Sequence, residues 1–289
     1  MHPAVFIVIL LITTFVTYQV FGGLLTISIL GVDLKTLPEN LLKTRIILSF
    51  AQFMFILFPA ILLSLLQGNK FTETFRIRKP NFAIFFLAIF GLVVVQPFLQ
   101  VFLYLQNKLI FSLPFGIEFL KQVKDLFDAL EQTTMSLVTA NSIPEFIFVV
   151  FIIAVTPAIC EEFLFRGLLF KNLERVSLRR NAIFLTGLIF AIFHFHPFNL
   201  IPLIVLGFYL TFVVYYSESI WTAVVCHFTN NFISAYSVFK FGKDNIAEPE
   251  ISGMQLVQFG ILGLVSLVLF IFIMIYMVKI YNKKTRKAY

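Results

Sequence analysis

The sequence predicts an all-α polytopic membrane protein with about eight transmembrane helices and one amphipathic interfacial helix. Of the 289 residues, 60% are hydrophobic and 13% are charged, whereas soluble domains are about 45–50% apolar and about 25% charged. The apolar residues form runs of roughly 20 residues, the length that crosses a bilayer core about 30 Å thick. Because these runs fill the whole length, a single anchor on a soluble domain is excluded.

Eight segments are candidate membrane spans, and we place them at residues 4–30, 46–66, 81–105, 145–170, 181–196, 198–216, 219–239 and 254–280. The first lacks the basic n-region and small-residue cleavage site of a signal peptide, so we interpret it as a membrane helix. The fifth and sixth spans are separated only by His196-Pro197. Proline disfavours helical geometry in the residue before it, which supports a break there.

Residues 117–130 are predicted to form the amphipathic helix. Leu120, Val123, Phe127 and Leu130 recur at helical spacing, and charged side chains occupy the other side. This helix is expected to lie on the outer membrane surface or to cap the bundle. We divide the one integral membrane domain into N-terminal helices with the amphipathic helix (1–143), a core that carries the intramembrane polar residues (144–239), and the last helix with its basic tail (240–289).

The net charge of +7 is interpreted as a signal of membrane orientation and not of nucleic-acid binding. Lys and Arg concentrate in the loops 70–79 and 171–180 and in the tail 279–287. The positive-inside rule therefore places both termini in the cytoplasm, and an even number of spans requires both termini on one side. Cys160 and Cys226 lie in apolar runs and predict neither a disulfide framework nor a cysteine-rich metal site.

Ionisable side chains inside a span are costly, so each is a functional hypothesis. The fourth span contains Glu161, Glu162 and Arg166. Glu162 and Arg166 are four residues apart and share a helix face, where a salt bridge offsets part of the cost of burial. That pair either supports a site or only joins helices. Glu161 points elsewhere and has no partner in its own helix, which makes it a candidate general base.

Two later spans add polar residues at a similar depth. The fifth ends in His194 and His196, of which His196 is expected at the interface; the seventh carries His227 and Asn231 on one face and Asn230 off it. Together with Glu161 these side chains suit hydrolysis of an acyl bond. Glu161 would deprotonate water with His194 as its partner, and His227 and Asn231 would donate hydrogen bonds to the oxyanion. Two histidines and a carboxylate also resemble a catalytic zinc shell, although no His-Glu-x-x-His motif is present.

Three motifs occur in order: Glu161-Glu162-x-x-x-Arg166, Phe190-x-x-x-His194 and His227-x-x-x-Asn231. In these the sequence resembles the CAAX prenyl endopeptidase/Abi family of intramembrane glutamic proteases (the CPBP family). The resemblance implies an eight-helix fold and hydrolysis without a metal or other cofactor. It implies that Glu161 activates water with the aid of His194, that His227 and Asn231 form the oxyanion hole, and that Glu162 and Arg166 support the site.

The resemblance also suggests substrates and biological roles. The family's eukaryotic members remove the last three residues of prenylated CAAX proteins, and some prokaryotic members are tied to bacteriocin self-immunity. Before the third motif the family often has small residues and a Thr-Gly, whereas this chain reads Leu-Gly-Phe-Tyr at 206–209 and Tyr-Ser-Glu-Ser at 216–219. That departure concerns the fit of the substrate more than catalysis.

The leading hypothesis is an intramembrane, glutamate-dependent endopeptidase that cleaves near the C-terminus of a membrane-associated substrate, with a prenylated CAAX-type peptide as one candidate. Its expected partners are the lipid bilayer and that peptide or protein. The alternatives are a non-enzymatic membrane immunity or scaffold protein, and a zinc-dependent protease that uses the same residues. A transporter would need a polar path through several helices, and the first three spans offer little beyond Gln96 and Gln100.

Overall fold

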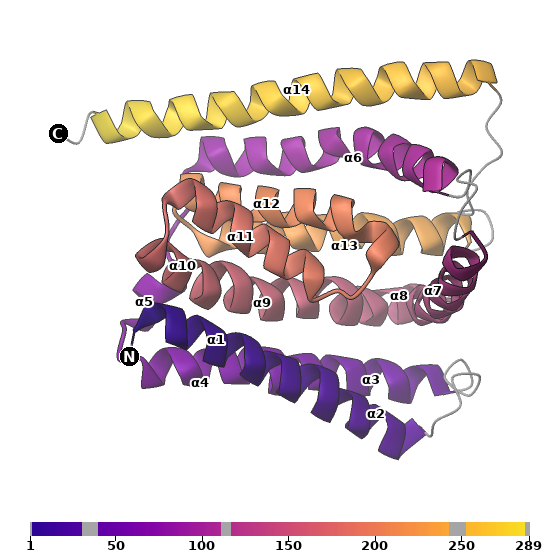
Figure 1. Cartoon of the computed structure of the whole chain (residues 1–289), viewed down its shortest axis with the longest axis horizontal. Helices are drawn as coiled ribbons and strands as arrows, with labels where there is room; N and C mark the ends of the chain where they lie inside the picture. Colours follow the sequence, from indigo (N-terminus) through magenta and orange to yellow (C-terminus); the bar gives the residue numbers. More distant parts are fainter. Residues whose placement is uncertain (1, 31–39, 111–116, 243–252, 287–289) are drawn as a thin grey trace.

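Long helical rods run along one common direction and form a bundle (Figure 1). The computed structural model describes residues 2–30, 40–110, 117–242 and 253–286, and no β-strand occurs within these ranges. Large apolar side chains are exposed on the outside of the bundle, for example Leu264 and Phe272 on the last helix. Such an exterior suits a lipid surrounding, and helices satisfy their own backbone hydrogen bonds there. The all-α polytopic membrane fold is therefore confirmed.

The N-terminal rods are interrupted by π-helical turns. The first two rods consist of α1 (Pro3–Thr14), η1 (Phe15–Gly22) and α2 (Gly23–Leu30), and of α3 (Leu41–Gln52), η4 (Phe53–Leu57) and α4 (Phe58–Leu66). A short helix α5 (Phe71–Thr74) leads to the long α6 (Phe82–Ile110), and α7 (Ile117–Val138) follows.

The C-terminal half begins with a composite rod made of α8 (Ile143–Val150), η5 (Phe151–Val155), α9 (Thr156–Glu162), η6 (Phe163–Leu169) and α10 (Phe170–Val176). It continues with α11 (Arg179–Ile192), the 3-10 turn η7 (Pro197–Asn199), α12 (Leu200–Ser217), α13 (Ile220–Phe241) and α14 (Gly253–Arg286).

Within the part of the chain that the structure describes, six rods have the length and apolar composition of a membrane span: Pro3–Ile29, Leu41–Leu66, Phe82–Ile110, Ile143–Val176, Pro197–Ser217 and Gly253–Arg286. The predicted span 181–196 is too long, because α11 has 14 residues and ends at Ile192. Its length is about 21 Å at 1.5 Å per residue. α13 is long enough with 22 residues, but polar side chains near His227 lower its hydropathy. A helix lies at each of the eight predicted positions, yet a count of eight spans is not confirmed.

The central position in the bundle belongs to α13, which packs against α12, α9, η5 and α6. In Figure 1, α14 runs beside α6 along one edge, and the two N-terminal rods form the opposite edge. The start of α1 and the end of α14 lie at the same end of the bundle. That placement agrees with termini on one side of the membrane; which side is cytoplasmic stays a prediction.

The amphipathic segment forms α7, which is longer than predicted and lies across the end of the bundle remote from the chain termini (Figure 1). Its Phe127 ring packs against His196 at 5.1 Å and against Phe198 at 6.0 Å between ring centroids. Phe119 and Leu126 are exposed. The structure thus shows α7 capping the bundle, and its predicted place on the outer membrane surface stays a prediction.

Glycines allow α11 and α12 to approach so closely that their backbones touch. A Cβ atom on Gly187 would lie 2.4 Å from the backbone nitrogen of Phe208, and one on Gly207 would lie 2.7 Å from the carbonyl oxygen of Gly187. Backbone atoms cannot move aside as a flexible side chain can. The pair of glycines therefore fixes the spacing of the two helices that flank the turn with His194.

We expect Gly187→Ala to lower the free energy of unfolding by about 1–3 kcal/mol, the usual cost of overpacking. Gly260→Ala is the matched control, because nothing lies within 4 Å of a Cβ atom built at Gly260. Alanine there should be neutral or stabilising, by up to about 1 kcal/mol. Thermal unfolding of both variants in detergent micelles measures the difference, and equal midpoints would contradict the backbone contact.

Candidate active site

Four π-helical segments, η1, η4, η5 and η6, lie in the three rods around Glu161. Such segments are rare and frequently occur at functional sites. In the composite rod α8–α10, Pro157 has no backbone N–H, so it cannot donate to the carbonyl of Ile153 four residues earlier. The side-chain amide of Asn231 donates to that oxygen at 3.1 Å. The proline thus creates an acceptor that anchors the neighbouring helix α13.

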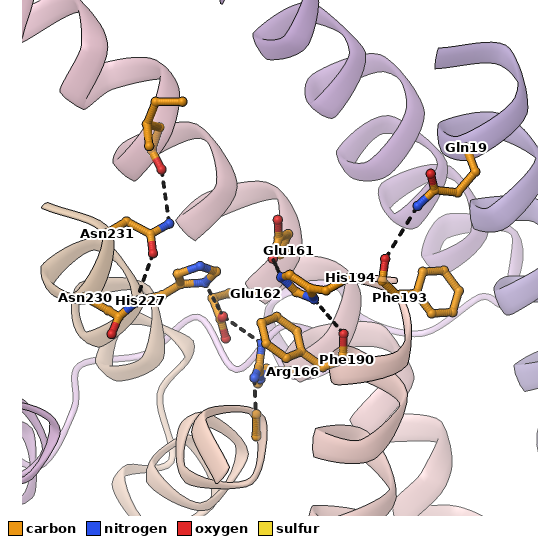
Figure 2. A network of polar contacts seen from close by, with 12 residues as sticks. Gln19, Glu161, Glu162, Arg166, Phe190, Phe193, His194, His227, Asn230 and Asn231 are labelled. Atoms are coloured by element: carbon orange, nitrogen blue, oxygen red, sulfur yellow. Dashed lines mark hydrogen bonds and ion pairs between the residues drawn. The ribbon is translucent and has the colours of Figure 1, made fainter. Parts of the chain in front are cut away.

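A buried ionic cluster joins α9, η6 and α13 (Figure 2). Oε1 of Glu162 accepts hydrogen bonds from Nη1 of Arg166 and from Nδ1 of His227, both at 2.8 Å. All three side chains are almost fully buried. Arg166 also donates to the carbonyl of Gly207 at 3.2 Å and lies over the Phe190 ring at 4.2 Å. The predicted Glu162–Arg166 pair therefore forms, and His227 joins it.

Glu161 faces a different partner. Its Oε2 lies 3.9 Å from Nε2 of His194, a separation too long for a direct hydrogen bond. Among the described residues, Oε2 is buried and has no hydrogen-bond partner. The side chain of Glu161 is 15% exposed and that of His194 is 31% exposed. The two groups are therefore close enough to share a water molecule, on the accessible side of the buried cluster.

His194 lies in the turn after α11, and its orientation is fixed by the backbone. Nδ1 of the ring lies 2.8 Å from the carbonyl oxygen of Phe190. A carbonyl only accepts, so Nδ1 carries a proton and Nε2 is the nitrogen that faces Glu161; in a neutral ring with this tautomer Nε2 has a lone pair. The same reasoning puts a proton on Nδ1 of His227, because Glu162 is its acceptor.

A chain of side-chain amides sets the direction of Asn231. Gln96 on α6 donates to Oδ1 of Asn230 at 3.1 Å, and Asn230 donates to Oδ1 of Asn231 at 3.2 Å. With its oxygen engaged by Asn230, Asn231 directs its NH₂ group toward Ile153 and the composite rod. One hydrogen bonds Ile153, and the second hydrogen is available to another acceptor.

The structure brings the predicted residues together in two pairs of contacts, Glu161 with His194 and His227 with Glu162, beside Asn231 (Figure 2). It does not bring in His196, whose side chain caps the turn η7 by accepting from the backbone of Asn199. The roles assigned to these residues stay predictions.

Sequence reasoning missed the contributions of the first rod (α1, η1 and α2) and of α6 to this site. Thr14, Tyr18 and Gln19 line a cavity of about 270 Å³ together with Glu161 and His194. In the sequence Gln96 is an isolated polar residue of the third predicted span, with no sign of its partner Asn230. The signal that could have found these residues is the one applied to the fourth span: a polar side chain in an apolar span needs a partner.

The zinc alternative requires three ligands around one point. Among the residues that the structure describes, no group of three His, Cys, Asp or Glu side chains is placed to hold a metal ion. His194 and His227 face different carboxylates. Cys160 and Cys226 are both buried as free thiols. The donor set as arranged therefore does not fit a zinc site.

Comparison with known families places these residues in context. Residues 143–233, which span all three motifs, match the family model described as type II CAAX prenyl endopeptidase Rce1-like. The match covers 91 of the 289 residues. Searches of curated proteins and of solved structures found no match. The matched segment and its motifs identify residues 143–233 as similar to the CAAX proteases of the CPBP family, and the apolar bundle identifies the chain as an integral, multi-pass membrane protein.

Proposed function

We propose that the protein is an intramembrane glutamic endopeptidase that hydrolyses a peptide bond near the C-terminus of a membrane-associated substrate, with a prenylated CAAX-type peptide as the first candidate. The single observation that carries the proposal is the buried Oε2 of Glu161, which has no hydrogen-bond partner among the described residues and lies 3.9 Å from Nε2 of His194. A carboxylate and an imidazole at this separation can both accept hydrogen bonds from one water molecule.

In the proposed reaction Glu161 takes a proton from the water while the water oxygen forms a bond to the substrate carbonyl carbon. His194 holds the second hydrogen of the water and so orients its lone pair. When the tetrahedral intermediate collapses, the C–N bond breaks and the proton on Glu161 passes to the leaving amine. The products are a peptide that ends in a carboxylic acid, whose hydroxyl keeps the second hydrogen of the water, and a released short peptide with a free amino group. Glu161 returns to its starting state.

His227 and Asn231 would stabilise the oxyanion of that intermediate. With Nδ1–H engaged by Glu162, His227 can donate from Nε2 only as an imidazolium. Asn231 supplies its second amide hydrogen. One such donor contributes about 10²–10³-fold to the rate.

The purified chain should release the last three residues from a farnesylated peptide, as measured by mass spectrometry. Because the proposed chemistry uses no metal, 1,10-phenanthroline should leave the rate unchanged. Loss of cleavage with the chelator and recovery with added Zn²⁺ would establish the zinc alternative. If neither this peptide nor its unprenylated form is cleaved, the proposal fails, and the immunity or scaffold alternative takes its place.

Gln96→Leu removes the start of the amide chain that directs Asn231. We expect about a tenfold lower kcat with little change in KM, because a misdirected oxyanion donor weakens the transition state more than substrate binding. Gln100→Leu is the matched control, since Gln100 is exposed on the same helix. A higher KM at unchanged kcat for Gln96→Leu would contradict this positioning role.

A further inference from the structure

The cavity beside Glu161 has a polar wall that lies outside the matched segment. Thr14, Tyr18 and Gln19 on the first rod form this wall, and Glu161 and His194 lie across the cavity of about 270 Å³. The proposed chemistry uses Glu161 and His194 but assigns nothing to the first rod. The proposed chemistry therefore leaves the role of these three polar side chains, on one face of an apolar membrane helix, unexplained.

The π-helical turn explains how these side chains share a face. A π-helix closes its backbone hydrogen bonds between residues five apart, where an α-helix closes them between residues four apart. Thr14 and Gln19 are five residues apart, and η1 begins directly after Thr14. In a regular α-helix Gln19 would point well away from Thr14. The local geometry of the first rod thus directs both side chains into the cavity.

Two polar groups of this wall, Thr14 and Gln19, have hydrogen-bonding capacity left. Thr14 is 1% exposed, and its hydroxyl oxygen has no hydrogen-bond partner among the described residues. Gln19 donates to the Phe193 carbonyl at 3.5 Å, at the limit of a hydrogen bond. Tyr18 lies next to the Gln52 amide and within electrostatic range of Glu161. A buried hydroxyl left unsatisfied is costly, so a ligand that bonds it gains affinity.

The remaining walls define the chemistry of that ligand. Ile56, Leu164 and Phe165 are apolar, and among the described residues no lysine or arginine side chain lines the cavity. With Glu161 present, an anionic group would be repelled. The volume lies below the roughly 300 Å³ at which small-molecule pockets begin, too small for a peptide together with a lipid chain. An uncharged residue with its backbone amide fits these conditions.

We propose that the first rod forms the peptide-binding wall of the site, with Thr14 and Gln19 bonding backbone amides of the uncharged residues next to the scissile bond. The identity of the peptide in this inference rests on the proposed function. The lipid group of a prenylated substrate then stays outside this cavity.

Photo-crosslinking tests the contact without requiring turnover. The probe is a farnesylated peptide with photoleucine at each of its last three positions in turn, bound to the full-length Glu161→Gln variant, and crosslinks are mapped by mass spectrometry. At least one position should label residues 14–22, and excess unlabelled peptide should compete. Thr14→Val and Gln19→Leu should each reduce this labelling about threefold to tenfold, the effect of one lost hydrogen bond.

Thr26→Val is the matched control, because the Thr26 hydroxyl bonds only the carbonyl of Gly22 in its own helix, and its labelling should equal that of the parent. Labelling confined to other rods, or labelling unaffected by both cavity substitutions, would overturn the inference. Wild-type hydrolysis of the same peptide separates the two proposals. Cleavage without labelling of the first rod refutes the wall alone, whereas competed labelling without cleavage refutes the proposed function and retains the wall.

Discussion

Glu161→Gln is expected to lower the rate of peptide cleavage by about 10²–10⁴-fold, the contribution of a positioned general base. The amide has the size and shape of the carboxylate but cannot accept a proton from water. Because Glu161 makes no direct hydrogen bond through Oε2, this substitution breaks no hydrogen bond of that atom. The thermal midpoint in detergent should therefore stay close to that of the wild type while kcat falls.

Glu73→Gln makes the same chemical change at a side chain that is 60% exposed, and it should leave both kcat and stability unchanged. A Glu161→Gln protein that cleaves at the wild-type rate would refute Glu161 as the base. A phenotype in cells that survives Glu161→Gln would favour the immunity or scaffold alternative.

Arg166→Met should lower the free energy of unfolding by about 3–5 kcal/mol, the cost of leaving one member of a buried ion pair uncompensated. The substitution removes the hydrogen bonds from Arg166 to Glu162 and to the Gly207 carbonyl. It leaves the Glu162 carboxylate with His227 as its one remaining partner in the cluster. Chemical unfolding in micelles of wild type and variant measures the difference.

Two further variants separate loss of a charge partner from loss of packing. Glu162→Gln combined with Arg166→Met removes both charges, so the double variant should be more stable than Arg166→Met alone. Arg180→Met is the control at an exposed arginine on α11, with an expected change within about 0.5 kcal/mol. A double variant less stable than Arg166→Met would show that packing, not charge, dominates.

The sequence by itself determined the fold class, the approximate positions of the eight predicted spans and the Glu162–Arg166 pair. Apolar runs longer than a bilayer core require helices, because no other structure in lipid satisfies the backbone except a closed barrel. The scarcity of charge made Glu161, Glu162 and Arg166 conspicuous, and the four-residue spacing of Glu162 and Arg166 was enough to predict their pair. These are local properties, visible over a few residues of one helix.

Only the tertiary structure decided which helix supplies each remaining partner. His227 bonds Glu162 across 65 positions of sequence, Gln96 reaches Asn230 across 134, and Gln19 reaches the Phe193 carbonyl across 174. Helical periodicity gives the face on which a residue lies but not the neighbour that the face meets. The end of α11 at Ile192 and the π-helical turns were likewise not predictable, because apolar periodicity shows neither where a helix ends nor where its hydrogen bonds change to a spacing of five residues. The amino-acid composition of the chain therefore established that it lies in a bilayer. The packing of its helices assembled the few polar groups into a site.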